Sequence, residues 1–107
     1  MLEKKYYSVD FSNVKEYNDI HRILDESLKF AEFYYEDLDS LYDCLTDMLC
    51  DISIIEIHGI ENLKKYNDYD KRISEVFSYA KHAWGAKSCD RFFATIVHKD
   101  GTREEIK

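Results

Sequence analysis

Residues 30–49 read FAEFYYEDLDSLYDCLTDML, and the rest of the chain is organised around this stretch. An aromatic segment, residues 33–35, leads into a run whose apolar side chains recur at the spacing of one helix face. The apolar positions of this predicted helix are Leu38, Leu41, Tyr42, Leu45, Met48 and Leu49. Asp37 precedes them and suits the N-cap, where its carboxylate accepts from the backbone N–H of Asp39 or Ser40. The stretch therefore predicts an amphipathic helix entered through an aromatic loop.

The opposite face of this helix is acidic. Asp39, Asp43 and Asp47 follow one another at intervals of four residues, so their side chains lie along one line. Each like-charged pair at this spacing costs roughly 0.2–0.5 kcal/mol, and only Asp39 is favoured by the helix dipole. Taken alone, the pattern favours a solvated helix face, with a surface for a basic partner as the alternative.

The composition describes an acidic chain rich in aromatic residues. Its 107 residues, which we expect to form a single domain spanning residues 1–107, carry 15 basic and 22 acidic side chains and a net charge of −7. This charge disfavours non-specific binding to nucleic acid or to an anionic membrane. No apolar run approaches the roughly 20 residues of a membrane span, and no signal peptide is apparent at the start. Three cysteines without a CxxC pair predict reduced thiols and a cytoplasmic location.

The N-terminal half predicts a strand and a helix before the opening stretch, and a second strand after it. Residues 4–11 are rich in β-forming residues. Asn18 is a suitable N-cap for a helix that runs to about Lys29. The apolar stripe of this helix is Ile20, Ile23, Leu24 and Leu28, and its expected solvated face carries His21, Arg22, Asp25 and Glu26. Residues 52–57, ISIIEI, predict a strand covered on both faces or nearly so.

The C-terminal half predicts a further helix and strand. Residues 60–66 suit a short helix, and Asn67, Asp68 and Asp70 offer N-caps for a longer one that ends near Trp84, with Gly85 as its C′ residue. Its apolar stripe is Ile73, Val76, Phe77, Ala80 and Trp84. Residues 89–97 predict a third strand, and a turn at residues 99–101 leads to a possible exposed antiparallel strand over residues 102–106.

These elements define the fold class as α/β. Strands that alternate with helices predict a small three-stranded parallel sheet with about four helices, plus a possible C-terminal antiparallel edge strand. The right-handed crossover rule places consecutive helices on one face of the sheet. We expect Tyr34 to pack against the core, and Cys44 and Cys89 to be buried free thiols.

The segment AEFYYEDLDSLYDCLT, residues 31–46, resembles the corresponding segment of the barstar family, intracellular inhibitors of barnase-type ribonucleases. The similarity runs back into the first predicted helix through Leu24, His21, Ile20 and Asp19, and forward to Glu56. It weakens afterwards, although Val76-Phe77, Ala80-Lys81 and Cys89-Asp90 still resemble the family, and the tail beyond Val97 is additional. The resemblance implies a barstar-like fold.

The resemblance also implies a function and a set of partner-binding residues. In the family, the second helix and the loop before it block the active-site cleft of a basic ribonuclease. By position, Asp43 takes the role of mimicking an RNA phosphate, and Asp39 that of contacting other basic groups. The other positions assigned to the partner surface are Phe33, Tyr35, Asp37, Tyr42, Asp47 and Tyr79. Three of the departures from the family are Tyr35 for a glycine, Ala31 for a proline and Tyr79 for an acidic residue.

We therefore expect a non-enzymatic inhibitor of a basic ribonuclease that is monomeric when free and uses no cofactor. The alternative is a binding or regulatory module of the same fold for a different cationic protein, which the changes at Tyr35 and Tyr79 favour. A hydrolytic metal site on the three aspartates is a third interpretation, but it needs ligands from a second element. His21, His58, His82 and His98 lack the spacing of a zinc site.

Overall fold

The computed structural model describes residues 2–30 and 34–107. Its sheet has the order β1-β2-β3-β4, in which β1, β2 and β3 are parallel and β4 is antiparallel to β3. The elements in chain order are β1 (Lys4–Asp10), α1 (Tyr17–Leu28), α2 (Leu38–Asp47), the 3-10 turn η1 (Met48–Cys50), β2 (Ile52–His58), the 3-10 turn η2 (Ile60–Leu63), α3 (Tyr69–Lys81), α4 (Ala86–Cys89), β3 (Phe92–Val97) and β4 (Arg103–Glu105). The predicted α/β class and the parallel sheet are confirmed.

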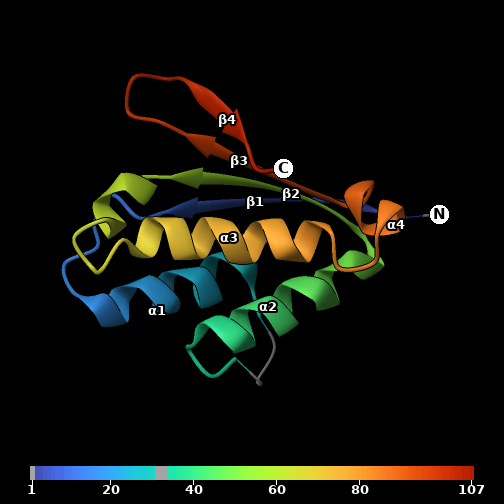
Figure 1. Ribbon diagram of the computed structural model, residues 1–107, viewed down its shortest axis with the longest axis horizontal. Helices are drawn as coiled ribbons and strands as arrows, with labels where there is room; N and C mark the ends of the chain where they lie inside the picture. Colours follow the sequence, from blue (N-terminus) through green and yellow to red (C-terminus); the bar gives the residue numbers. More distant parts are fainter. Residues whose placement is uncertain (1, 31–33) are drawn as a thin grey trace.

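The long helices lie on one side of the sheet, as the crossover rule predicts (Figure 1). In β2, Ser53, Ile55 and Ile57 are buried and the residues between them are only partly buried. The strand was predicted to be covered on both faces or nearly so, and the structure shows one buried face and one partly covered face. On the open face, Ile52 and Ile54 are partly covered by the neighbouring strands β1 and β3, although no helix among the described residues lies above them. This partial shielding explains why a central strand carries an apolar run.

The C-terminal hairpin pairs within the chain. Arg103 lies opposite Val97, and Glu105 opposite Thr95. Ile106 then turns inward, donates its backbone N–H to the Ala94 carbonyl at 2.8 Å and is 7% exposed. The predicted edge strand is confirmed, and in Figure 1 the hairpin lies on the far side of β2 from β1.

Two predicted boundaries near the end of α3 are wrong. The helix ends at Lys81 instead of near Trp84, and Gly85 (φ 64°) precedes the short helix α4 rather than closing α3. The cause is Ser88, whose buried hydroxyl donates to the Lys81 carbonyl at 2.6 Å and accepts from the Trp84 N–H at 3.0 Å. Because these bonds replace the helical pattern, Trp84 leaves the apolar stripe and is 45% exposed.

The strand that was predicted from Cys89 begins only at Phe92, because residues 86–89 form α4. The buried Lys81 ammonium donates to the carbonyls of Cys89 (3.3 Å) and Phe92 (2.7 Å) and so fastens this turn to α3. Cys44 and Cys89 are partly buried rather than buried, and all three cysteines are free thiols. Burial is the main cause that raises the pKa of the Cys44 thiol.

The start of α1 also differs from its prediction. The N-cap is Glu16 and not Asn18, because the Asp19 carboxylate accepts from the backbone N–H groups of Glu16 (3.1 Å) and Lys15 (3.0 Å). An acidic residue at the third helical position thus reaches back to the cap, as in a capping box. The Asn18 side chain is exposed.

His21 was predicted on the solvated face of α1 and is instead 1% exposed. Its Nε2 is hydrogen-bonded to the Tyr69 hydroxyl at 2.6 Å, and its Nδ1 is in contact with the Tyr34 hydroxyl. The stripe of α1 is wider than the sequence suggests, because these two tyrosines satisfy both ring nitrogens away from water. Tyr34 packs against the core and the Phe30 ring, as expected.

Lys29 at the end of α1 gives a first test of the local geometry. It adopts a left-handed conformation (φ 56°) that an L side chain disfavours and glycine accepts freely. We expect Lys29→Gly to raise the free energy of unfolding by about 0.5–1 kcal/mol in urea titrations. The matched change Glu26→Gly, inside the same helix, should lower it by roughly the same amount. A destabilised Lys29→Gly protein would contradict the assigned conformation.

His21 gives a second test, through pH. Burial lowers the pKa of His21, an effect that the nearby Glu36 and Asp37 carboxylates oppose. Below the ordinary pKa of about 6.5, the unfolded chain binds a proton at this residue that the folded protein does not bind. The free energy of unfolding should therefore fall as the pH drops from 7 to 5.5, and His21→Gln should flatten this slope in urea titrations. Equal slopes for the two proteins would show that His21 does not titrate differently on folding.

Candidate functional site

The loop before α2 and the first turn of this helix are fastened to each other by polar contacts. The Asp37 carboxylate accepts from the Ser40 N–H at 2.7 Å, which confirms the predicted N-cap. The Ser40 hydroxyl in turn accepts from the Tyr35 N–H at 2.9 Å. The loop therefore enters the helix in a defined conformation, with Asp37 at the surface.

Tyr35 is 72% exposed and lies directly before Glu36, whose backbone is left-handed (φ 59°). The tyrosine that stands in the place of the family's glycine thus adopts an ordinary backbone conformation. Phe33, which the sequence analysis also assigned to the partner surface, lies outside the described residues, as do Ala31 and Glu32.

The apolar face of α2 packs on α3 and on the core, so that its acidic face points outward. Leu41 and Leu45 are fully buried. Asp39 and Asp43 are exposed, and within the described part of the chain neither carboxylate has an ion-pair partner. Two like charges one helical turn apart are therefore presented to solvent without compensation.

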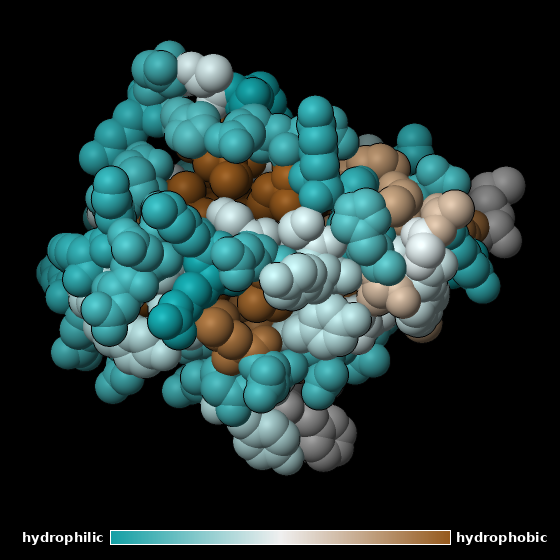
Figure 2. All heavy atoms as spheres, viewed as in Figure 1, coloured by the Kyte–Doolittle hydropathy of each residue, from teal (hydrophilic) through white to brown (hydrophobic). Residues whose placement is uncertain are grey.

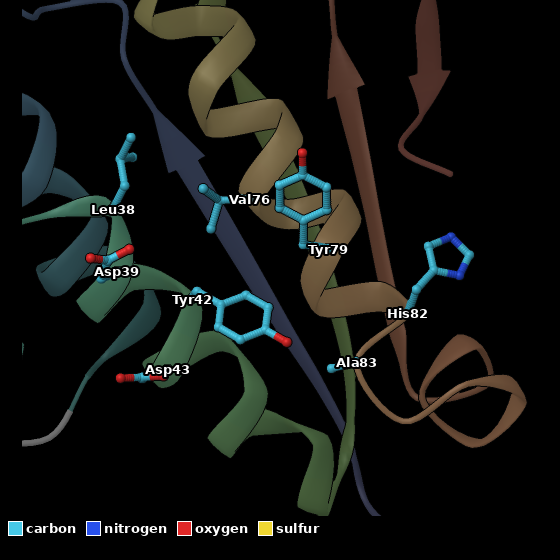
Figure 3. A pocket seen from close by; sticks show the side chains of 8 residues that line it. All are labelled: Leu38, Asp39, Tyr42, Asp43, Val76, Tyr79, His82 and Ala83. Atoms are coloured by element: carbon cyan, nitrogen blue, oxygen red, sulfur yellow. The ribbon is translucent and has the colours of Figure 1, made fainter.

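A groove of about 840 Å³ lies between α2 and α3 beside these carboxylates. The residues that line it are Leu38, Asp39, Tyr42, Asp43, Val76, Tyr79, His82 and Ala83. In Figure 3, the aspartates lie on the α2 side and the Tyr42 ring extends toward α3; Tyr79 comes from α3, and His82 directly follows that helix. Figure 2 shows hydrophobic surface between these two helices, bordered by hydrophilic side chains. The groove thus combines an apolar floor, two tyrosine rings and an acidic edge.

The structure brings together four of the eight predicted partner-binding residues in this groove, namely Asp39, Tyr42, Asp43 and Tyr79. Tyr35 and Asp37 lie in the loop that leads into the same helix. Asp47 does not line the groove; it lies at the other end of α2, in a hollow that Lys5, Lys29 and Asp51 also line. His82 follows the last residue of α3 and lies three residues after Tyr79; the sequence did not single it out, although the helical spacing of three residues could have indicated it.

Other kinds of site find no support in the described residues. Residues 2–30 and 34–107 contain no group of three or more His, Cys, Asp or Glu side chains placed to hold a metal ion. Over the same residues, no helix has the length and apolar character needed to cross a membrane. A thiol–imidazole contact joins Cys89 Sγ to His82 Nδ1 at 3.4 Å, at the exposed end of α3.

The comparison with known families agrees with the similarity of residues 31–46. The family model described as barstar, the barnase inhibitor, matches residues 5–96 of the 107-residue chain. The match extends from β1 to β3 and includes the loop, α2 and α3, while the β4 segment follows it. The members of this family are described as inhibitors of barnase and not as catalysts. On this match the chain belongs to the barstar family of barnase inhibitors.

Proposed function

We propose that this protein is a cytoplasmic inhibitor that binds a basic, barnase-type ribonuclease and blocks its active-site cleft with α2 and the preceding loop. The observation that carries the proposal is the exposed, uncompensated pair Asp39 and Asp43 beside the groove between α2 and α3. The family supports the partner class, and three free thiols suit a reducing compartment.

The chemistry of the proposed contact follows from charge. A ribonuclease cleft must be cationic to hold RNA phosphates, so carboxylates presented on a rigid helix are attracted into it. Inside the cleft, Asp43 accepts charge-assisted hydrogen bonds from Arg or Lys, and Asp39 does the same one turn away. Asp47 lies outside the groove and adds only to the long-range attraction. The net charge of −7 acts in the same direction.

The aromatic residues supply the rest of the surface. Tyr42 and Tyr79 offer ring faces to an arginine side chain, which binds aromatic rings through cation–π attraction. Tyr79 is 61% exposed and Tyr35 is 72% exposed, so both rings are available to a partner. Asp37 has its Oδ1 occupied by the Ser40 N–H and keeps Oδ2 for a partner's donor. Phe33 belongs to the same proposed surface by its place in the sequence.

A second candidate is a regulatory module of the same fold that binds another cationic protein. The exposed Tyr79 favours it, because this ring stands where the family carries an acidic contact residue. A nuclease that needs that carboxylate for binding would lose affinity for this chain. The same groove would then hold a basic segment of a partner that is not a nuclease.

The test of the first proposal is a titration of barnase-type ribonucleases with the protein. We expect at least one of them to lose activity at a one-to-one ratio. Asp43→Ala should then weaken binding by roughly 3–5 kcal/mol, because it leaves a buried cationic group of the enzyme without its partner. The matched control is Glu105→Ala, which removes one negative charge from the exposed strand β4, outside the groove, and should change affinity less than about tenfold.

The outcomes separate the two candidates. Inhibition that Asp43→Ala leaves intact would overturn the role assigned to this carboxylate. Absence of inhibition across the ribonucleases, together with binding of a basic protein that is not a nuclease and is lost in Asp43→Ala, would favour the second candidate.

A further inference from the structure

We infer that His21 is a positioning residue for the partner-binding surface: its buried imidazole holds the loop before α2 and the start of α3 in fixed relation through two tyrosine hydroxyls. The inference rests on the proposed function, because it concerns the same surface. It starts from an anomaly of α1, a helix that buries a histidine at 1% exposure where a solvated residue was predicted.

The imidazole lies between two elements that are far apart in the sequence. Tyr34 in the loop contacts Nδ1, and Tyr69, the first residue of α3, is bonded to Nε2 at 2.6 Å. A neutral imidazole has one donor and one acceptor nitrogen, and a phenol can meet either. Burial keeps this ring neutral at pH 7, since it lowers the pKa of His21. Both polar atoms of the buried ring are therefore satisfied only while both tyrosines stay in place.

The contact with His21 restricts the conformation of the loop before α2. Tyr34 directly precedes Tyr35, whose N–H donates to Ser40, and Asp37 caps α2. The loop is thus attached to α1 on one side and to α2 on the other. Between the attachments Glu36 adopts a left-handed conformation, which costs an L residue roughly 1–2 kcal/mol. Without the bond to His21, that cost favours other conformations of the loop.

The second contact carries the effect to α3. The Tyr69 hydroxyl is bonded to His21 and, at 3.2 Å, to the Tyr17 hydroxyl. The rings of Tyr17 and Tyr69 meet edge to face with their centroids 5.2 Å apart. Tyr69 begins the helix that presents Tyr79. One imidazole therefore holds both the loop and the start of α3 in position. A surface ordered in this way before binding loses less conformational freedom when the partner arrives.

The test compares two hydroxyl deletions in the full-length protein. Tyr34→Phe removes the bond between the loop and His21, and Tyr17→Phe removes the outer bond to Tyr69 and leaves the loop attached. We expect Tyr34→Phe to raise the Kd for the inhibited ribonuclease roughly 3- to 10-fold, and Tyr17→Phe to leave it unchanged. In the free protein, exchange of the Tyr35 amide hydrogen should be faster in Tyr34→Phe only, with circular dichroism confirming that both variants are folded.

The amide-exchange measurement needs no partner, so it keeps the inference testable if no ribonuclease is inhibited. Unchanged Tyr35 exchange in Tyr34→Phe overturns the inference, as does a Kd that rises equally in both variants or changes in neither. The proposed function fails separately, when no barnase-type ribonuclease is inhibited by the protein. A protein in which Asp43→Ala weakens the complex and Tyr34→Phe does not would retain the function and lose the positioning role of His21.

Discussion

The packing of α2 against α3 is the constraint on which the proposed binding surface depends. Leu41 and Leu45 are buried completely, so the helix has one rotation about its axis that satisfies the core. That rotation presents Asp39 and Asp43 to solvent, although their mutual repulsion lowers the stability of the helix. The repulsion is small compared with the burial of two leucines, each worth about 1.5–3 kcal/mol. An acidic face is therefore compatible with a stable fold and remains available for a cationic partner.

The polar interior around His21 complements this apolar packing. A buried imidazole without partners would be costly, and two tyrosine hydroxyls remove that cost only in one arrangement of three elements. Hydrophobic contacts alone tolerate small shifts of a loop, whereas a directed hydrogen bond such as that between the Tyr34 hydroxyl and His21 does not. The core thus supplies the stability of the surface, and the polar cluster defines its geometry.

The sequence predicted the strands of the parallel sheet and the helix that carries the acidic face, because both depend on local patterns. The apolar run ISIIEI and the Leu38–Leu49 stripe are signals that a few neighbouring residues contain. It did not predict the burial of His21, since the hydroxyls that satisfy the ring come from residues 13 and 48 positions away. The end of α3 was missed for a similar reason, because Ser88 competes for backbone groups from outside the helix.

In the candidate site, too, local patterns were predictable and contacts between distant segments were not. Asp39, Tyr42 and Asp43 reach the same groove because they lie within about one helical turn of each other, where the acidic face of α2 borders its apolar stripe, and the helical pattern gives this spacing. The place of Tyr79 and His82 across from them depends on how two helices pack, and the pattern of either helix alone does not contain it. Asp47 has the same spacing as Asp39 and Asp43 but does not line the groove. Eight residues beyond Asp39, the helix has passed the end of the groove.

The most direct measurement is amide hydrogen exchange of the protein alone and in complex with the ribonuclease it inhibits. We expect slower exchange on binding in residues 35–43 and around Tyr79, with no change in β4. Protection centred on β4 or on the open face of the sheet, with residues 35–43 unchanged, would contradict it.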